Sequence, residues 1–148
     1  MAVDVETEIV IDRPRAEVAA FCADPDNATR WYRNITAVEW VTAPPLAAGS
    51  RLAFVASFLG RRLSYTYEVR EHVPGERFVM STQEGPFPMR TTYTWEDADA
   101  ETGTGTLMRL RNDGEPSGFA GVAAPMMARA MRSANRKDLA LLKQVLEG

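Results

Sequence analysis

Hydrophobic and polar residues alternate over residues 3–11 with the period of a strand that has one buried face. The side chains expected on the buried face are Val3, Val5, Thr7, Ile9 and Ile11. Two short helices are predicted next. Asp12 is expected to cap the first, with Pro14 in its first turn, and Asp24-Pro25 begins the second, which should end near Trp31-Tyr32.

From Ile35 onward, turn residues rich in glycine and proline divide the chain into six further predicted strands. Their approximate spans are 35–42, 50–58, 62–72, 76–83, 87–96 and 104–112. Because the connections between them are short, successive strands should be antiparallel neighbours, since parallel pairing needs a long crossover.

The last segment changes to a period of three to four residues, which predicts one amphipathic helix over residues 125–146. At 1.5 Å per residue this helix is about 33 Å long, enough to cross a small sheet. Pro125 fits its first turn. A helix that began earlier, near Phe119, should instead be kinked at Pro125.

These elements predict an α+β fold in a single domain over residues 1–148. A curved, seven-stranded antiparallel sheet has two short helices after its first strand and a long C-terminal helix packed across it. One parity of the strands collects bulky side chains, while the other carries residues such as Arg62, Glu68 and Arg90 that belong in solvent.

The bulky side chains that point inward from the strands include many aromatic rings, and two interpretations of them remain open. The rings fill the space under the helix, or they line a cavity for an apolar ligand. The candidate ligand-binding residues are Trp31, Phe54, Phe58, Tyr65, Tyr67, Phe78, Met80, Met89, Thr91, Tyr93, Trp95, Met108, Met127 and Met131. Phe87 shares the inward parity. The helix methionines would serve equally as ordinary core residues.

Several segments in order and at characteristic spacing resemble the polyketide cyclase/dehydrase and lipid-transport branch of the SRPBCC, or START-like, superfamily. They are IDRPRAEVAAFCADPDNATRW, AAGSRLAF, YEVREHVPGERFVM, YTWED followed by GTGTLMRLR, and NRKDLALLKQVLE. The resemblance implies the helix-grip fold, with a ligand cavity between the sheet and the long helix. It supplies no shared catalytic motif, because relatives include both binding proteins and aromatase/cyclases.

Composition excludes several classes of function. The net charge is −3 and the arginines are scattered, so nucleic acid is not an expected partner. No apolar run is long enough to span a bilayer, and the acidic N-terminus does not have the pattern of a signal peptide. The expected location is the cytoplasm. Nothing in the sequence distinguishes a monomer from a homodimer.

Candidate catalytic chemistry is sparse, and neither a metal nor a cofactor is expected. His72 is the only histidine, and its parity points outward at a surface turn. Cys22, the only cysteine, is expected to be an inert, packed thiol. The phenols of Tyr65, Tyr67 and Tyr93 could donate hydrogen bonds to a carbonyl or an enolate, or simply to backbone carbonyls.

Two functions follow. The first is binding of a hydrophobic small molecule, such as a lipid, an isoprenoid or a polyketide-like aromatic compound. The alternative is an enzyme that cyclises or dehydrates a ketide in the same cavity. Trp31 and Tyr32 should lie near the cavity rim, where Arg30 or Arg33 could meet a ligand carboxylate.

Overall fold

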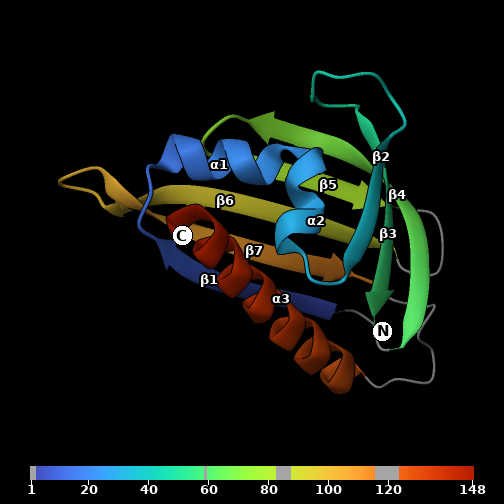
Figure 1. Ribbon diagram of the computed structural model, residues 1–148. Helices are drawn as coiled ribbons and strands as arrows, with labels where there is room; N and C mark the ends of the chain where they lie inside the picture. Colours follow the sequence, from blue (N-terminus) through green and yellow to red (C-terminus); the bar gives the residue numbers. More distant parts are fainter. Residues whose placement is uncertain (1–2, 59, 83–87, 116–123) are drawn as a thin grey trace.

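A computed structural model describes residues 3–58, 60–82, 88–115 and 124–148, and within these residues the chain forms seven strands and three α-helices (Figure 1). The strands are β1 (Val3–Ile11), β2 (Ile35–Trp40), β3 (Arg51–Phe58), β4 (Arg61–Val73), β5 (Arg77–Thr82), β6 (Met89–Asp99) and β7 (Thr104–Gly114). The helices are α1 (Arg15–Ala23), α2 (Ala28–Trp31) and α3 (Ala124–Glu147), with a 3₁₀ turn, η1 (Pro25–Asn27), before α2.

The seven strands form one antiparallel sheet in the order β1-β7-β6-β5-β4-β3-β2. Consecutive strands from β2 to β7 are therefore neighbours, as their short connections predict, and only β1 pairs out of sequence, with β7. Gly75 and Gly103 lie in two of the turns with φ values of 80° and 67°, a region that suits glycine. The predicted fold class is confirmed.

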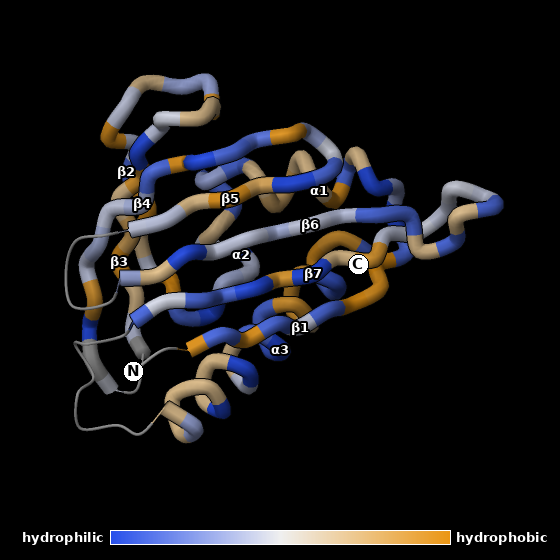
Figure 2. Tube along the Cα trace, turned by 180° about the vertical axis from the view of Figure 1, so that it is seen from behind, coloured by the Kyte–Doolittle hydropathy of each residue, from blue (hydrophilic) through white to orange (hydrophobic). Residues whose placement is uncertain are grey.

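All three helices lie on one face of the sheet, and Figure 1 shows α3 running obliquely along β1 while α1 and α2 cover the strands beside it. Seen from behind, the strands cross in front of the helices, and β1 shows alternating hydrophobic and hydrophilic positions (Figure 2). The buried face of α3 includes Met127, Met131, Leu139 and Leu142. The core thus lies between the helices and the inner face of the sheet.

The helix boundaries agree with those predicted from the sequence, except at the N-cap of α1. Pro125 lies in the first turn of α3, which begins at Ala124, and the alternative start near Phe119 falls outside the described residues. Asp24 caps η1, its carboxylate accepting a hydrogen bond from the Asp26 N–H at 3.0 Å. Asp12 does not cap α1, because Pro14 occupies the N-cap position and no side chain bonds there.

Asp12 instead joins the two ends of the fold. Its backbone N–H donates to Glu147 Oε2 at 2.8 Å, so the end of β1 is tied to the end of α3.

The predicted orientation of His72 is wrong, because an irregularity in β4 reverses the alternation of its side chains. The pairing of β4 with β5 shifts between Val69 and Glu71, and one extra residue in a strand moves every later side chain to the other face. His72 is consequently half-buried, with its ring edge-on to Phe78 at a centroid distance of 5.7 Å.

Candidate functional site

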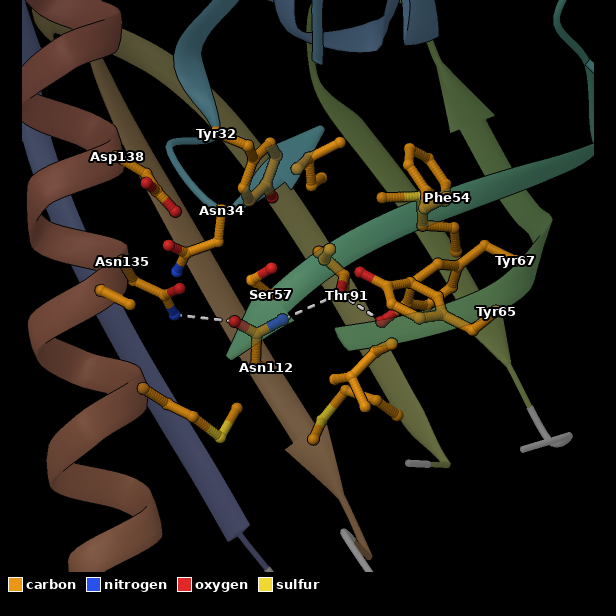
Figure 3. A pocket seen from close by; sticks show the side chains of 17 residues that line it. Tyr32, Asn34, Phe54, Ser57, Tyr65, Tyr67, Thr91, Asn112, Asn135 and Asp138 are labelled. Atoms are coloured by element: carbon orange, nitrogen blue, oxygen red, sulfur yellow. Dashed lines mark hydrogen bonds between the residues drawn. The ribbon is translucent and has the colours of Figure 1, made fainter. Parts of the chain in front are cut away.

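A pocket of about 120 Å³ lies between the inner face of the sheet and α3 (Figure 3). Strands β2 to β7 contribute to its wall, and α3 closes it from the other side. The segment between α2 and β2 supplies Tyr32 and Asn34. Asn34 is half-buried and Ser57, on β3, is exposed, so these two residues lie where the pocket approaches solvent.

Aromatic rings from β3 and β4 form one wall of the pocket. The Phe54 ring lies 6.0 Å from that of Tyr65 and 5.8 Å from that of Tyr67, and the two tyrosine rings meet edge to face at 5.3 Å. Such offset and edge-on contacts hold aromatic side chains in fixed orientations. Met80 and Met89 extend this apolar wall across β5 and β6.

The opposite wall carries polar side chains linked by hydrogen bonds (Figure 3). Asn135 Nδ2 on α3 donates to Asn112 Oδ1 on β7 at 2.7 Å, and Asn112 Nδ2 donates to Thr91 Oγ1 on β6 at 2.8 Å. The Thr91 hydroxyl in turn lies 3.3 Å from the hydroxyl of Tyr67. These four residues connect the helix to the aromatic wall.

Asp138, one turn after Asn135 on α3, places a buried carboxyl group at the same pocket. Its Oδ1 accepts a hydrogen bond from the backbone N–H of Arg33 at 3.0 Å. Burial nevertheless raises the pKa of Asp138 from 3.8 to about 6, because this N–H and the nearby Arg33 charge only partly replace the lost hydration. The pocket therefore contains a carboxyl group that changes charge near neutral pH.

Half of the sequence-predicted ligand residues line this pocket. They are Phe54, Tyr65, Tyr67, Met80, Met89, Thr91 and Met131. The side chains of Phe58 and Phe87 lie outside the described part of the structure.

The remaining predicted residues are buried in the surrounding core: Trp31, Phe78, Tyr93, Trp95, Met108 and Met127. Trp31 is fully buried and contacts Tyr32 and Tyr93, with ring centroids 4.1 and 5.7 Å away. The hydroxyl groups of Tyr32 and Tyr93 are hydrogen-bonded to each other. Tyr93 is thus hydrogen-bonded to a residue of the pocket wall but does not line the pocket itself.

Sequence reasoning missed a set of polar residues that line the pocket: Asn34, Ser57, Asn112, Asn135 and Asp138. Two signals pointed to part of it. Asn112 continues the inward parity of Met108 and Leu110, and Asn135 and Asp138 interrupt the apolar face of the long helix. Buried polar side chains on an otherwise apolar face need partners, and such positions are frequent at binding sites.

Three other predicted residues lie away from the pocket. The Arg30 guanidinium lies over the Phe21 ring at 5.0 Å, and Arg33 is exposed and donates its backbone N–H to Asp138. The Cys22 thiol is buried and donates to Met108 Sδ at 3.7 Å. Burial raises the pKa of this thiol, so it stays protonated.

Within the described residues, no group of three or more His, Cys, Asp or Glu side chains is arranged to hold a metal ion. No described helix is long and apolar enough to cross a membrane.

No curated protein matches the sequence significantly, but solved structures match the fold. A START superfamily protein from Mycobacterium smegmatis aligns with a TM-score of 0.80 at 13% identity, over 97% of each chain. An aromatase/cyclase from a Streptomyces species aligns with a TM-score of 0.78 at 16% identity, over 99% of this chain and 94% of that one.

The di-domain ARO/CYC BexL from the BE-7585A biosynthetic pathway aligns with a TM-score of 0.74 at 23% identity. The match covers 97% of this chain but 46% of BexL, so the chain spans about half of that protein. At these identities the structural likeness shows a shared fold. The sequence profile described as polyketide cyclase / dehydrase and lipid transport matches residues 2–147, nearly the whole sequence. With its START-like fold, the chain therefore belongs to the polyketide cyclase/dehydrase and lipid-transport family.

Proposed function

We propose that this protein, acting as one ligand-binding domain, binds a hydrophobic small molecule in the pocket between the sheet and α3. The observation that carries the proposal is the lining: aromatic rings and methionines on one wall, and a few hydrogen-bonded polar groups on the other. Natural small-molecule sites combine a mostly apolar surface with a small number of placed polar groups in this way.

The volume of the pocket limits the size of the ligand that it can enclose. An engineered apolar cavity of about 150 Å³ binds benzene, so a pocket of about 120 Å³ suits one aromatic ring or a short branched chain. A longer lipid, isoprenoid or polyketide-like ligand would extend past Asn34 and Ser57 toward solvent. Met80, Met89 and Met131 can adjust their shape to different ligands, because methionine side chains are unbranched and flexible.

Methionine methyl groups offer a site-specific test. With isotope-labelled methionine, titration with benzene should shift the signals of Met80, Met89 and Met131 saturably, while Met126, which is exposed on α3, should not respond. A parallel titration with palmitate distinguishes a lipid site from an aromatic site, and native mass spectrometry of protein purified without detergent would reveal a co-purifying ligand.

Two helix variants provide the control. Ala134 lines the pocket, so Ala134→Leu should fill part of it and weaken binding about tenfold or more. Ala140 is exposed on the same helix, and Ala140→Leu should leave binding unchanged. The proposal fails if no probe shifts the three methionine signals, or if both leucine variants bind like the parent protein.

Asp138 favours a second candidate function, an enzyme that cyclises or dehydrates a ketide. A carboxyl group with a pKa of about 6 can both accept and donate protons near neutral pH, as a general acid or base must. Asp138→Asn should then keep ketide binding but abolish turnover. Unchanged turnover in this variant would exclude Asp138 as the catalytic group.

A further inference from the structure

The hydrogen bonds of the polar wall run in one direction. The amide Nδ2 groups of Asn135 and Asn112 can only donate, so Asn112 Oδ1 and Thr91 Oγ1 are the acceptors of these two bonds. Asn112 uses its amide oxygen toward α3 and its amide nitrogen toward β6, which fixes its orientation between the helix and the sheet.

The direction continues from Thr91 to Tyr67. Thr91 is 3% exposed, and its hydroxyl oxygen already accepts from Asn112. Its own proton needs an acceptor, and among the described residues the partner that remains is the Tyr67 hydroxyl oxygen at 3.3 Å. Thr91 therefore donates to Tyr67, and the chain reads Asn135 to Asn112 to Thr91 to Tyr67 (Figure 3).

The Tyr67 hydroxyl is the last group in this series of hydrogen bonds, and the series does not use its own proton. Within the described part of the chain its hydroxyl has only the Thr91 contact, although the side chain is 7% exposed and lines the pocket. Burial raises the pKa of Tyr67 to about 12, so the phenol keeps its proton at physiological pH. A buried donor without an acceptor is costly, and each bond in a chain polarises the next donor.

We propose that the ligand of this pocket carries a hydrogen-bond acceptor, of which a ketone carbonyl is the simplest, and that the Tyr67 hydroxyl donates to it. Tyr67 is then the specificity-determining residue, while Thr91, Asn112 and Asn135 are positioning residues that hold its hydroxyl with the proton directed into the pocket. The inference rests on the proposed function, because it concerns the ligand of the same pocket.

Two probes of nearly equal shape test it. Acetophenone and α-methylstyrene differ only in a carbonyl oxygen in place of a methylene group, and each has one ring, as the volume requires. Binding is followed by the methyl signals of Met80, Met89 and Met131. Tyr67→Phe should weaken acetophenone binding about five- to tenfold and leave α-methylstyrene within about twofold, because only the ketone loses a hydrogen bond.

Variants of Thr91 test whether the hydrogen bonds that lead to Tyr67 position its hydroxyl group. Thr91→Val should weaken acetophenone about two- to threefold, with no effect on α-methylstyrene, because the phenol remains but loses the partner that orients it. Thr91→Ser restores the hydroxyl and should recover ketone binding. Thr94→Val is the matched control, since Thr94 lies three residues along β6 and does not line the pocket.

The double variant Tyr67→Phe/Thr91→Val should bind acetophenone no more weakly than Tyr67→Phe alone, because both changes remove one shared effect. Equal losses for the two probes in Tyr67→Phe, or fully additive losses in the double variant, would overturn the inference while leaving the pocket a binding site. Failure of both probes to bind the parent protein would remove the proposed function, and this inference with it.

Discussion

Replacing Asp138 with asparagine should stabilise the protein near neutral pH. The side chain is 3% exposed, and burial raises its pKa from 3.8 to about 6. The Arg33 N–H bond and the Arg33 charge act in the opposite direction but do not cancel the effect of burial. Asparagine keeps an oxygen to accept the Arg33 N–H and carries no charge, so the cost of burying a carboxylate disappears.

The magnitude follows from linkage. One pKa unit corresponds to about 1.4 kcal/mol, so a rise of about two units makes ionised Asp138 cost about 3 kcal/mol of the free energy of unfolding. The folded state binds the proton more tightly than the unfolded state. The stability associated with the protonated group is therefore fully present below about pH 4 and is lost as pH rises through about 6.

Urea unfolding of both proteins between about pH 4 and pH 8 measures this directly, because the difference between them removes the other titrating groups. The advantage of Asp138→Asn should grow between about pH 4 and pH 6 and then level off at about 2–3 kcal/mol. Glu147→Gln is a control in which stability should change with pH in the opposite direction. The Asp12 N–H and Lys143 lower the pKa of Glu147, so its contribution is lost as pH falls.

A difference between Asp138→Asn and the parent protein that does not vary with pH would refute this reasoning. So would a variant less stable than the parent at neutral pH, since that would mean that the carboxylate contributes more through its contacts than its burial costs.

Two further variants or reagents probe the core beside the pocket. Tyr93→Phe removes one partner of the buried Tyr32–Tyr93 hydroxyl pair, so it should lower the free energy of unfolding by about 1–2 kcal/mol in urea melts. Acetophenone binding should change less than about twofold, and a larger loss would place Tyr93 at the ligand. Cys22 is buried with a raised pKa, so native protein should not react with a thiol reagent near pH 8, whereas urea-unfolded protein should react fully; rapid labelling of the native protein would contradict this.

The elements of this fold follow from local patterns that the sequence carries by itself. Alternation predicted β1, turn residues divided β2 to β7, and the three- to four-residue period predicted α3, because each pattern states directly which side of an element avoids water. The same patterns placed Phe54, Tyr65, Tyr67 and Met131 on the inner face, where the pocket lies.

Only the tertiary structure decided which inward side chains line space and which fill it. Tyr93 has the same inward pattern as Tyr67, but its ring packs against that of Trp31, at the end of α2, and does not line the pocket, whereas Tyr67 does. Alternation cannot encode which inward side chains meet a packing partner from another element. It also cannot reveal the β4 irregularity that turned His72 inward, since a single extra residue leaves no apolar signal.

The polar wall depended on tertiary structure most of all. Asn112 and Asn135 are separated by 23 positions, and each alone is an isolated amide on an apolar face. They become a directed pair because the packing of α3 brings them within hydrogen-bond distance, and Thr91 and Tyr67 join them from two further strands. Strand and helix periodicity specify which face a side chain occupies, whereas contacts between elements distant in sequence specify what that side chain can bind.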